Sequence, residues 1–320
     1  MKRKSSTLWV GGLIKNQIAF LIAIICVLVV AVTLVNPRFM TVKNITNLFK
    51  QISVTGTCSI AMALVLISGG FDLSVGSLVS LVGCFVATLI NAGVPEAAAL
   101  FLGVLCGLLC GGVNGFIIAK SNCAPVIITL GTMGAFKGVA LLIAKGNIVN
   151  FKAPISFLAS TTVSFIPTIV IIFLAVALVV FLFLKFTVVG RRMYALGSNQ
   201  EASFLAGVNL LTTKILVYTI AGGTVAFASI ALLMRLGSAS AVMGDSYTLN
   251  AVAAAVIGGI AITGGRGSIL GCLLGILLLG IISNAMNILG ITAYLQEIVL
   301  GTIVVVAAVI SELGNKDSKS

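Results

Sequence analysis

The stretch VVGRRMYALGSNQEASFLAGVNLL, residues 188–211, is the longest polar interval of this chain and joins two strongly apolar runs. Inside it, Ser198 and Glu201 have the three-residue spacing of a helix-capping box. They predict a short helix from about Asn199 to Ala206, which Gly207 can end in a left-handed turn. Two interpretations stay open at this point. The helix either belongs to an ordinary solvent loop or is presented to a soluble partner.

The composition is that of a polytopic membrane protein. Of 320 residues, 60% are hydrophobic and 8% are charged, and the mean hydropathy is +1.26, whereas soluble domains carry about 25% charged residues. We therefore expect an all-α bundle of transmembrane helices that forms a single integral domain over residues 1–320. The net charge of +12 does not indicate nucleic-acid binding, because membrane proteins concentrate Lys and Arg in cytoplasmic loops.

The apolar runs predict about ten spans, since a bilayer crossing takes about 20 apolar residues. The first run is longer than a signal-peptide core and lacks a small-residue cleavage motif, so we interpret it as a span. Gly56 interrupts the run at 51–71 and the run at 249–263 is short, so both are candidates for discontinuous helices. The predicted spans are 16–37, 51–71, 73–95, 97–119, 125–144, 167–184, 215–234, 249–263, 268–289 and 294–311.

Basic residues favour one orientation of these spans. With the N-terminus inside, twelve Lys and Arg residues fall in the predicted inner segments and six in the outer ones, while Lys137 falls within a span. An excess of Lys and Arg is typical of cytoplasmic segments. We therefore expect both termini and the loop at about 186–213 to be cytoplasmic.

A few short motifs recur in the second half of the chain, which indicates an internal repeat. In a ten-span arrangement the paired helices run in opposite directions, as an inverted repeat requires. The Gly-Gly pairs in 68–70 and 263–265 have a different spacing, so we attribute them to chance or to local turn chemistry. The recurring residues are Gly103 and Gly107 with Gly271 and Gly275, and the LGT triplets at 130–132 and 300–302.

The sequence contains no constellation that predicts an enzyme. It has no His, which excludes an imidazole zinc site and a His proton relay. Its seven Cys form no CxxC pair and read as small apolar side chains. It has no GxxxxGK[ST] motif, so we expect no ATPase site in this chain. We also expect neither a metal nor a cofactor.

Asp72 is a carboxylate between two apolar runs. It directly follows the turn residues Gly69 and Gly70 and lies two residues before Ser74. As an N-cap it would bond the first free amides of the next helix and complement the helix dipole. The alternative is a substrate or gating contact at a helix break, made by this stretch as a whole.

Four further polar residues fall within predicted spans. Lys137 costs about 2.5–3.5 kcal/mol at mid-bilayer, so we expect it to face the bundle interior or to extend toward the membrane surface. Asn114, Asn284 and Asn287 either form interhelical hydrogen bonds or line a pathway. Uncharged amides suit a sugar, whose hydroxyls need donors and acceptors but no counter-charge.

Several long segments together carry a resemblance to a known family. They are NPRFMTVKNITNLFKQIS (36–53), GGFDLSVGSLVSLVG (69–83), GRRMYALGSNQEASFLAGVN (190–209), AVAAAVIGGIAITGGRGSILG (251–271) and SNAMNILG (283–290). In order and spacing they resemble the permease subunit of ribose/xylose/galactose-type ABC importers. The resemblance implies a bacterial inner-membrane permease that dimerises with a second copy or a sister permease. It also implies two ATP-binding cassette subunits and a periplasmic or lipid-anchored sugar-binding protein as partners.

The same resemblance assigns roles within the loop at 186–213. Glu201, Ala202 and Ser203, with Gly207 after them, are similar to the motif by which such permeases couple to their ATPase, with Ser where Ala is common. Arg191 and Arg192 are suited to hold the base of the loop against anionic lipid or partner carboxylates. The segment YTLNA at 247–251 departs from the family's YELDA-like stretch, because it lacks both carboxylates.

We therefore predict a transport subunit that forms the pathway for a monosaccharide, a ribose-like pentose in the first place, and that couples to a separate ATPase. A self-contained, ion-coupled secondary carrier is the alternative. The chain has only seven Asp and Glu, whereas proton-coupled carriers usually contain several buried carboxylates or His residues. A third class, an integral membrane enzyme, finds no nucleophile–base pair in the sequence.

Overall fold

The computed structural model describes residues 6–121, 123–151, 162–163 and 166–317. Almost all of the regular structure is helical, and the strands form two short antiparallel pairs, β1 with β4 and β2 with β3. The elements are α1 (Ser6–Val35), the 3₁₀ helix η1 (Pro37–Met40), α2 (Val42–Ile67), α3 (Val75–Asn91), α4 (Glu96–Ser121), α5 (Pro125–Ala144), β1 (Val149–Asn150), β2 (Thr162–Val163), β3 (Ile166–Pro167), α7 (Thr168–Phe186), α8 (Val188–Ser198), α9 (Gln200–Leu205), α10 (Leu210–Leu236), β4 (Ser238–Ala239), α11 (Tyr247–Ile257), α12 (Ile269–Ile288) and α13 (Ala293–Asp317).

The prediction of an all-α polytopic membrane protein is confirmed. Within the described residues, seven helices are long and apolar enough to cross a membrane: α1, α2, α4, α5, α7, α10 and α12. Three shorter apolar helices, at Val75–Asn91, Tyr247–Ile257 and Tyr294–Val306, occupy the places of the other three predicted spans. At about 1.5 Å per residue, the 11 residues of α11 cover only about half of a ~30 Å hydrocarbon core.

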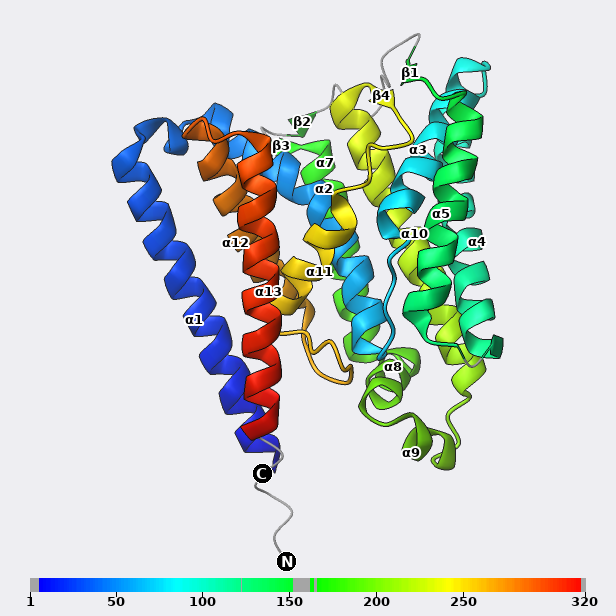
Figure 1. Ribbon diagram of the computed structural model, residues 1–320, viewed down its shortest axis with the longest axis vertical. Coiled ribbons are helices and arrows are strands. Elements are labelled where there is room, and N and C mark those ends of the chain that lie inside the picture. Colours follow the sequence, from blue (N-terminus) through cyan, green and yellow to red (C-terminus); the bar gives the residue numbers. More distant parts are fainter. Residues whose placement is uncertain (1–5, 122, 152–161, 164–165, 318–320) are drawn as a thin grey trace, which may run out of the picture.

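The long helices run roughly along the long axis of the molecule (Figure 1). We call the end that carries α8 and α9 the loop end, and the end that carries the four strands the strand end. The start of α1 and the end of α13 both lie at the loop end (Figure 1). The two ends of the described chain therefore lie on the same side of the bundle.

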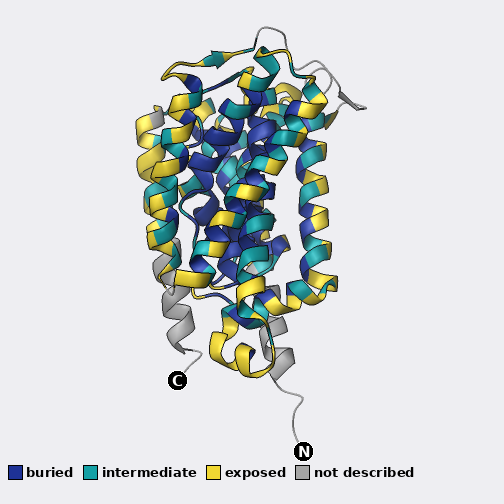
Figure 2. Ribbon diagram, turned by 90° about the vertical axis from the view of Figure 1, so that its right-hand side faces the viewer, coloured by how far each residue is buried: buried dark blue, intermediate teal, exposed yellow. Residues whose placement is uncertain are grey.

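Buried residues gather in the interior of the bundle (Figure 2), and α2 and α10 are the most buried of the long helices. Nearly every residue of α2 from Ile52 to Ile67 is buried. The predicted break at Gly56 is wrong, because α2 runs through this position without interruption. A Cβ at Gly56 would lie 2.5 Å from the ring of Phe173, so this glycine admits a neighbouring aromatic ring rather than ending the helix.

Glycines bring α4 and α10 into backbone contact. A Cβ at Gly107 would lie 2.6 Å from the carbonyl oxygen of Gly222, and one at Gly115 would lie 2.8 Å from the Cα of Ile215. Gly271 and Gly275 of α12 meet the backbone of α11 in the same manner. The recurring glycines of the two halves thus both mediate close helix packing, while the inverted repeat itself stays a prediction.

Two of the non-helical connections in the described part of the chain contain Gly-Gly turns. Residues 68–74 separate α2 from α3, and residues 258–268 separate α11 from α12. Gly69, Gly264 and Gly265 have φ of +77°, +89° and +72°, a region that favours glycine. Both connections reach the loop end beside α8 (Figure 1).

Candidate functional site

Three of the predicted pathway residues meet in one buried polar cluster. The Asn114 amide nitrogen donates to Ser74 Oγ at 2.9 Å, and Ser74 Oγ donates to Asp72 Oδ1 at 2.6 Å. Asp72, Ser74 and Asn114 are all buried. Asn114 comes from α4, so the cluster ties the segment before α3 to a neighbouring helix.

The prediction that Asp72 caps the helix after it is wrong. The helix α3 begins at Val75, and its N-cap residue is Ser74, which makes no side-chain capping bond. Asp72 Oδ1 instead accepts from the backbone N–H of Ser74 at 2.8 Å. The carboxylate therefore stabilises a turn that precedes the helix.

Side chains from three other helices hold the backbone of this segment. The carbonyl oxygen of Phe71 accepts from the hydroxyl of Tyr218 at 3.1 Å and from that of Thr129 at 3.4 Å. The hydroxyl of Thr248 donates to the carbonyl oxygen of Leu73 at 3.4 Å and accepts from the N–H of Gly76 at 2.8 Å. Non-helical backbone at membrane depth needs such partners, because lipid offers none.

Two further features mark this region: a tight contact at Gly70 and an unused hydrogen-bond acceptor on Asn114. Gly70 lies under the Tyr218 hydroxyl, since a Cβ there would be 2.6 Å from that oxygen. Asn114 Oδ1 is buried and has no hydrogen-bond partner in the described part of the chain. A buried acceptor of this kind is uncommon, and it gives the cluster one unused hydrogen-bonding position.

Lys137 forms an ion pair that the sequence did not reveal. Its ammonium nitrogen lies 2.6 Å from Asp245 Oδ2, and the two side chains are 37% and 48% exposed. Lys137 belongs to α5, and Asp245 precedes α11 by two residues. The only sequence signal was an acidic residue between apolar runs, a short way before the YTLNA segment.

The two predicted asparagines of α12 line a polar cavity of about 520 Å³ near the strand end. Asn284 exchanges two 2.9 Å hydrogen bonds with Asn44 of α2. The Asn287 side-chain oxygen accepts from Gln296 of α13 at 2.9 Å. Both asparagines therefore form interhelical bonds and also line the cavity, whose walls are formed by Asn44, Asn47, Lys50, Gln51, Arg235, Asn284, Asn287 and Ile288.

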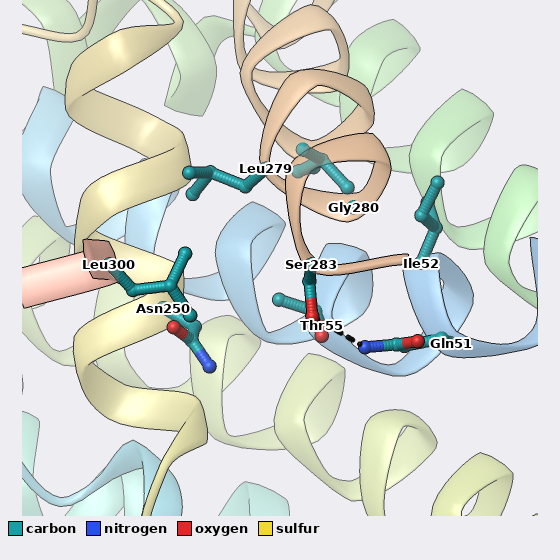
Figure 3. A pocket seen from close by; sticks show the side chains of 9 residues that line it. Gln51, Ile52, Thr55, Asn250, Leu279, Gly280, Ser283 and Leu300 are labelled. Carbon is teal, nitrogen blue, oxygen red and sulfur yellow. Dashed lines mark hydrogen bonds between the residues drawn. The ribbon is translucent and has the colours of Figure 1, made fainter. Parts of the chain in front are cut away.

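A second, smaller cavity of about 40 Å³ lies beside the first and shares Gln51 with it. Figure 3 shows Gln51 and Thr55 of α2 and Ser283 of α12 on one side, with Asn250 of α11 opposite them. The Gln51 amide nitrogen donates to Ser283 Oγ at 3.2 Å. An amide and a hydroxyl thus bridge α2 and α12 where the two cavities meet.

The loop at 186–213 contains two helices rather than the single one predicted, α8 and α9. Ser198 is not the cap of α9, because it is the last residue of α8 and its hydroxyl donates to the carbonyl oxygen of Tyr194 at 2.8 Å. Asn199 has an extended backbone and performs the capping, with its side-chain oxygen accepting from the Ala202 N–H at 2.8 Å. Gly207, with φ of +80°, ends this helix as predicted.

The helix α9 exposes most of its surface at the loop end. Glu201 and Ala202 are exposed, and so are Phe204 and Leu205, two large apolar side chains that sequence reasoning missed. Ser203 is buried and its hydroxyl donates to the carbonyl oxygen of Asn199 at 2.7 Å. In addition, Arg191 and Arg192 are exposed on α8.

The opposite face of α8 packs on the membrane bundle. Met193 and Leu196 are buried, and the hydroxyl of Tyr194 donates to the carbonyl oxygen of Gly267 at 3.1 Å. Burial raises the pKa of the Tyr194 phenol, so the phenol stays protonated and able to donate near neutral pH. The loop thus has a bundle-facing side on α8 and an open side on α9.

Comparison with known proteins identifies the family. Residues 44–308 match a family described as branched-chain amino acid transport system / permease component. The chain is a member of this permease family. The permease is also 36% identical over 293 residues to the ribose import permease protein RbsC of Bacillus subtilis (strain 168), covering 89% of each chain.

Other relatives have similar names. The permease is 34% identical over 322 residues to RbsC of Haemophilus influenzae, covering 99% of each chain. It is 36% identical over 314 residues to the L-arabinose transport system permease protein AraH of Escherichia coli (strain K12), covering 97% of this chain and 94% of the relative. No solved structure matches the chain. The family description mentions amino acids, whereas these individual relatives are named for sugars.

Proposed function

We propose that this permease is the membrane subunit of an ATP-binding-cassette importer of the bacterial inner membrane. Its cargo is a monosaccharide, a ribose-like pentose in the first place, because the relatives named above are ribose and arabinose permeases. The ATP is hydrolysed by a separate cassette subunit, and a periplasmic or lipid-anchored sugar-binding protein delivers the cargo. The observation that carries this proposal is the two-sided loop of α8 and α9, which matches the coupling motif in sequence and exposes α9.

The topology of this proposal has ten crossings with both termini in the cytoplasm. It is supported by the position of the start of α1 and the end of α13, which lie at the loop end together with α8 and α9. Basic side chains also favour a cytoplasmic loop end, since Lys185, Arg191, Arg192 and Arg266 lie in or beside the loop. The short helices α3 and α11 would then complete their crossings with the non-helical segments 68–74 and 258–268.

The ATPase would dock on α9. Phe204 and Leu205 are 66% and 81% exposed, and they lie on a loop that is in water rather than in lipid. An apolar pair of this kind fits a groove of a soluble partner, with Glu201 and Ala202 at its edge. Arg191 and Arg192 would hold the base of the loop against anionic lipid or partner carboxylates.

The pathway would run along the face of α5 that carries Lys137. A charged pair half-exposed to lipid within a span is costly, so this face is expected to border water or a second permease copy. Gly131, Gly134 and Gly138 of α5 have no atom within 4 Å of a Cβ position, which leaves room for close approach. Asp72, Ser74, Asn114, Asn284 and Asn287, with the Gly69–Gly70 turn, would supply the other polar contacts.

Reconstitution tests the proposal directly. The permease is placed in vesicles with the ATPase of its own gene neighbourhood and the cognate binding protein, and uptake of labelled ribose is measured. We expect uptake that needs ATP hydrolysis and persists with a protonophore. Uptake without the ATPase that collapses with the protonophore would instead identify an ion-coupled secondary carrier.

A further inference from the structure

The two Gly-Gly turns of the permease are in direct contact although they are far apart in sequence. A Cβ at Gly264 would lie 2.6 Å from the Cα of Gly69. The backbone N–H of Gly265 donates to the carbonyl oxygen of Ile67 at 2.9 Å. The turn that follows α2 and the connection that follows α11 therefore form one backbone-to-backbone junction, which we call the glycine junction.

The last turn of α8 enters this junction. A Cβ at Gly197 would collide with the carbonyl oxygen of Ile67 and would lie 2.5 Å from the nitrogen of Gly265. A Cβ at Gly265 would lie 2.6 Å from the Cα of Ser198. Most of these contacts are between backbone atoms, which cannot yield as a flexible side chain can. We therefore expect a displacement of α8 to be passed on to both turns.

A second contact joins the two helices next to these segments, α3 and α11. Thr248 of α11 accepts from the N–H of Gly76 at the start of α3, and a Cβ at Gly76 would lie 2.7 Å from its hydroxyl. The segment 68–74 is therefore linked to the α11 region at both of its ends. Asp72, Ser74 and the Phe71 carbonyl, which hold the buried polar cluster, lie between these two links.

We propose that Tyr194 and Gly197 are the positioning residues through which α8 moves the glycine junction and, with it, the buried polar cluster. This assignment rests on the proposed function and adds a division of labour within the loop. The α9 face binds the ATPase, whereas the α8 face transmits the movement. Tyr194 contributes its hydrogen bond to Gly267, and Gly197 contributes the close backbone approach.

The test compares two classes of variant in the reconstituted importer. Tyr194→Phe removes only the hydroxyl, so the protein is expected to fold, to co-purify with the ATPase and to keep ATP hydrolysis. Sugar transported per ATP hydrolysed is expected to fall about two- to tenfold, the range that one neutral hydrogen bond corresponds to. Gly197→Ala is expected to lower the ratio of sugar to ATP further. If the Gly197→Ala protein fails to accumulate, the result for Tyr194→Phe alone decides the test.

Tyr294→Phe is the matched control, because Tyr294 lies on α13 and is 82% exposed. It should keep the wild-type ratio of sugar to ATP. A wild-type ratio in Tyr194→Phe would overturn the inference, and so would loss of ATPase binding in that variant, because α8 would then belong to the docking surface. Absence of ATP-dependent uptake in the wild-type importer would instead reject the proposed function.

Discussion

Lys137 on α5 and Asp245 before α11 form an ion pair with 2.6 Å between the ammonium nitrogen and the carboxylate oxygen. The pair joins residues that lie 108 positions apart in the chain. Both side chains remain more than a third exposed, so solvent or a partner screens the attraction and the pair adds little to folding stability. If the pathway runs along α5 as proposed, we expect the pair to affect transport more than folding.

Exchanging the two charges tests this interpretation. Lys137→Asp and Asp245→Lys each place two like charges in contact, and we expect each to lower uptake roughly tenfold, equivalent to about 1.4 kcal/mol of coupling. The double variant restores an ion pair in reverse order and should recover most of the uptake. Uptake rates are normalised to the amount of protein in the membrane. A double variant no better than the worse single variant would show that the pair itself is not what transport needs.

Asp72 gives a second prediction, since its carboxylate oxygen accepts from both the N–H and the hydroxyl of Ser74. Asp72→Asn keeps a side-chain oxygen for these bonds, so we expect normal expression but slower uptake, because the charge is lost. Asp72→Ala removes the acceptor and leaves buried donors unpaired, which should cost about 1–3 kcal/mol of stability. Thermal unfolding of the purified permease separates the two effects. Equal melting temperatures for the Asn and Ala variants would contradict the structural role of the oxygen.

Local patterns in the sequence predicted local features, and contacts between distant segments escaped it. The polar stretch predicted the loop and its end at Gly207, because a left-handed glycine is specified by its neighbours. The predicted cap was Ser198, whereas the structure has Asn199 in this place. Both residue types cap well, and only the backbone conformation distinguishes them. The contact of Gly69 with Gly264 was missed, because nothing in a sequence states which turns meet in space.

The corrected cap makes a third prediction. Asn199→Ala removes the side-chain acceptor at the start of α9, which should cost about 1 kcal/mol and weaken binding of the ATPase about fivefold. Ser198→Ala serves as the control, because its hydroxyl bonds within α8 and caps nothing in α9. Binding is measured by titrating the purified ATPase onto the permease in detergent. A larger effect of Ser198→Ala than of Asn199→Ala would favour the original capping box.

The open face of α9 gives a fourth prediction. Glu201→Lys reverses an exposed charge. Gly207→Trp places a bulky side chain at a residue with left-handed backbone, which adds backbone strain and steric bulk at the end of α9. We expect both variants to insert normally but to lose co-purification with the ATPase and sugar-stimulated ATP hydrolysis. Glu297→Lys makes the same charge reversal on exposed surface near the strand end and should leave both quantities unchanged. Full complex formation in both loop variants would reduce the loop to a linker.

Glycine packing between α4 and α10 gives the last prediction, which concerns stability alone. A Cβ at Gly222 would collide with the carbonyl oxygen of Gly107 and would lie 2.9 Å from the Cα of Gly111. Backbone atoms on both sides leave no flexible side chain to yield, so Gly222→Ala must separate the two helices. Overpacking of this kind costs about 1–3 kcal/mol, and we expect a lower melting temperature of the purified permease.

Gly301→Ala supplies the contrast, because a Cβ at Gly301 has no atom within 4 Å. Gly301 lies within the helix α13, where alanine is favoured over glycine by about 0.5–1 kcal/mol. The same chemical change should therefore raise or preserve the melting temperature on α13 and lower it on α10. If Gly222→Ala melts at or above the wild-type temperature, the backbone contact between α4 and α10 is looser than the distances indicate. Close packing of these two helices would then not explain why they contain glycines.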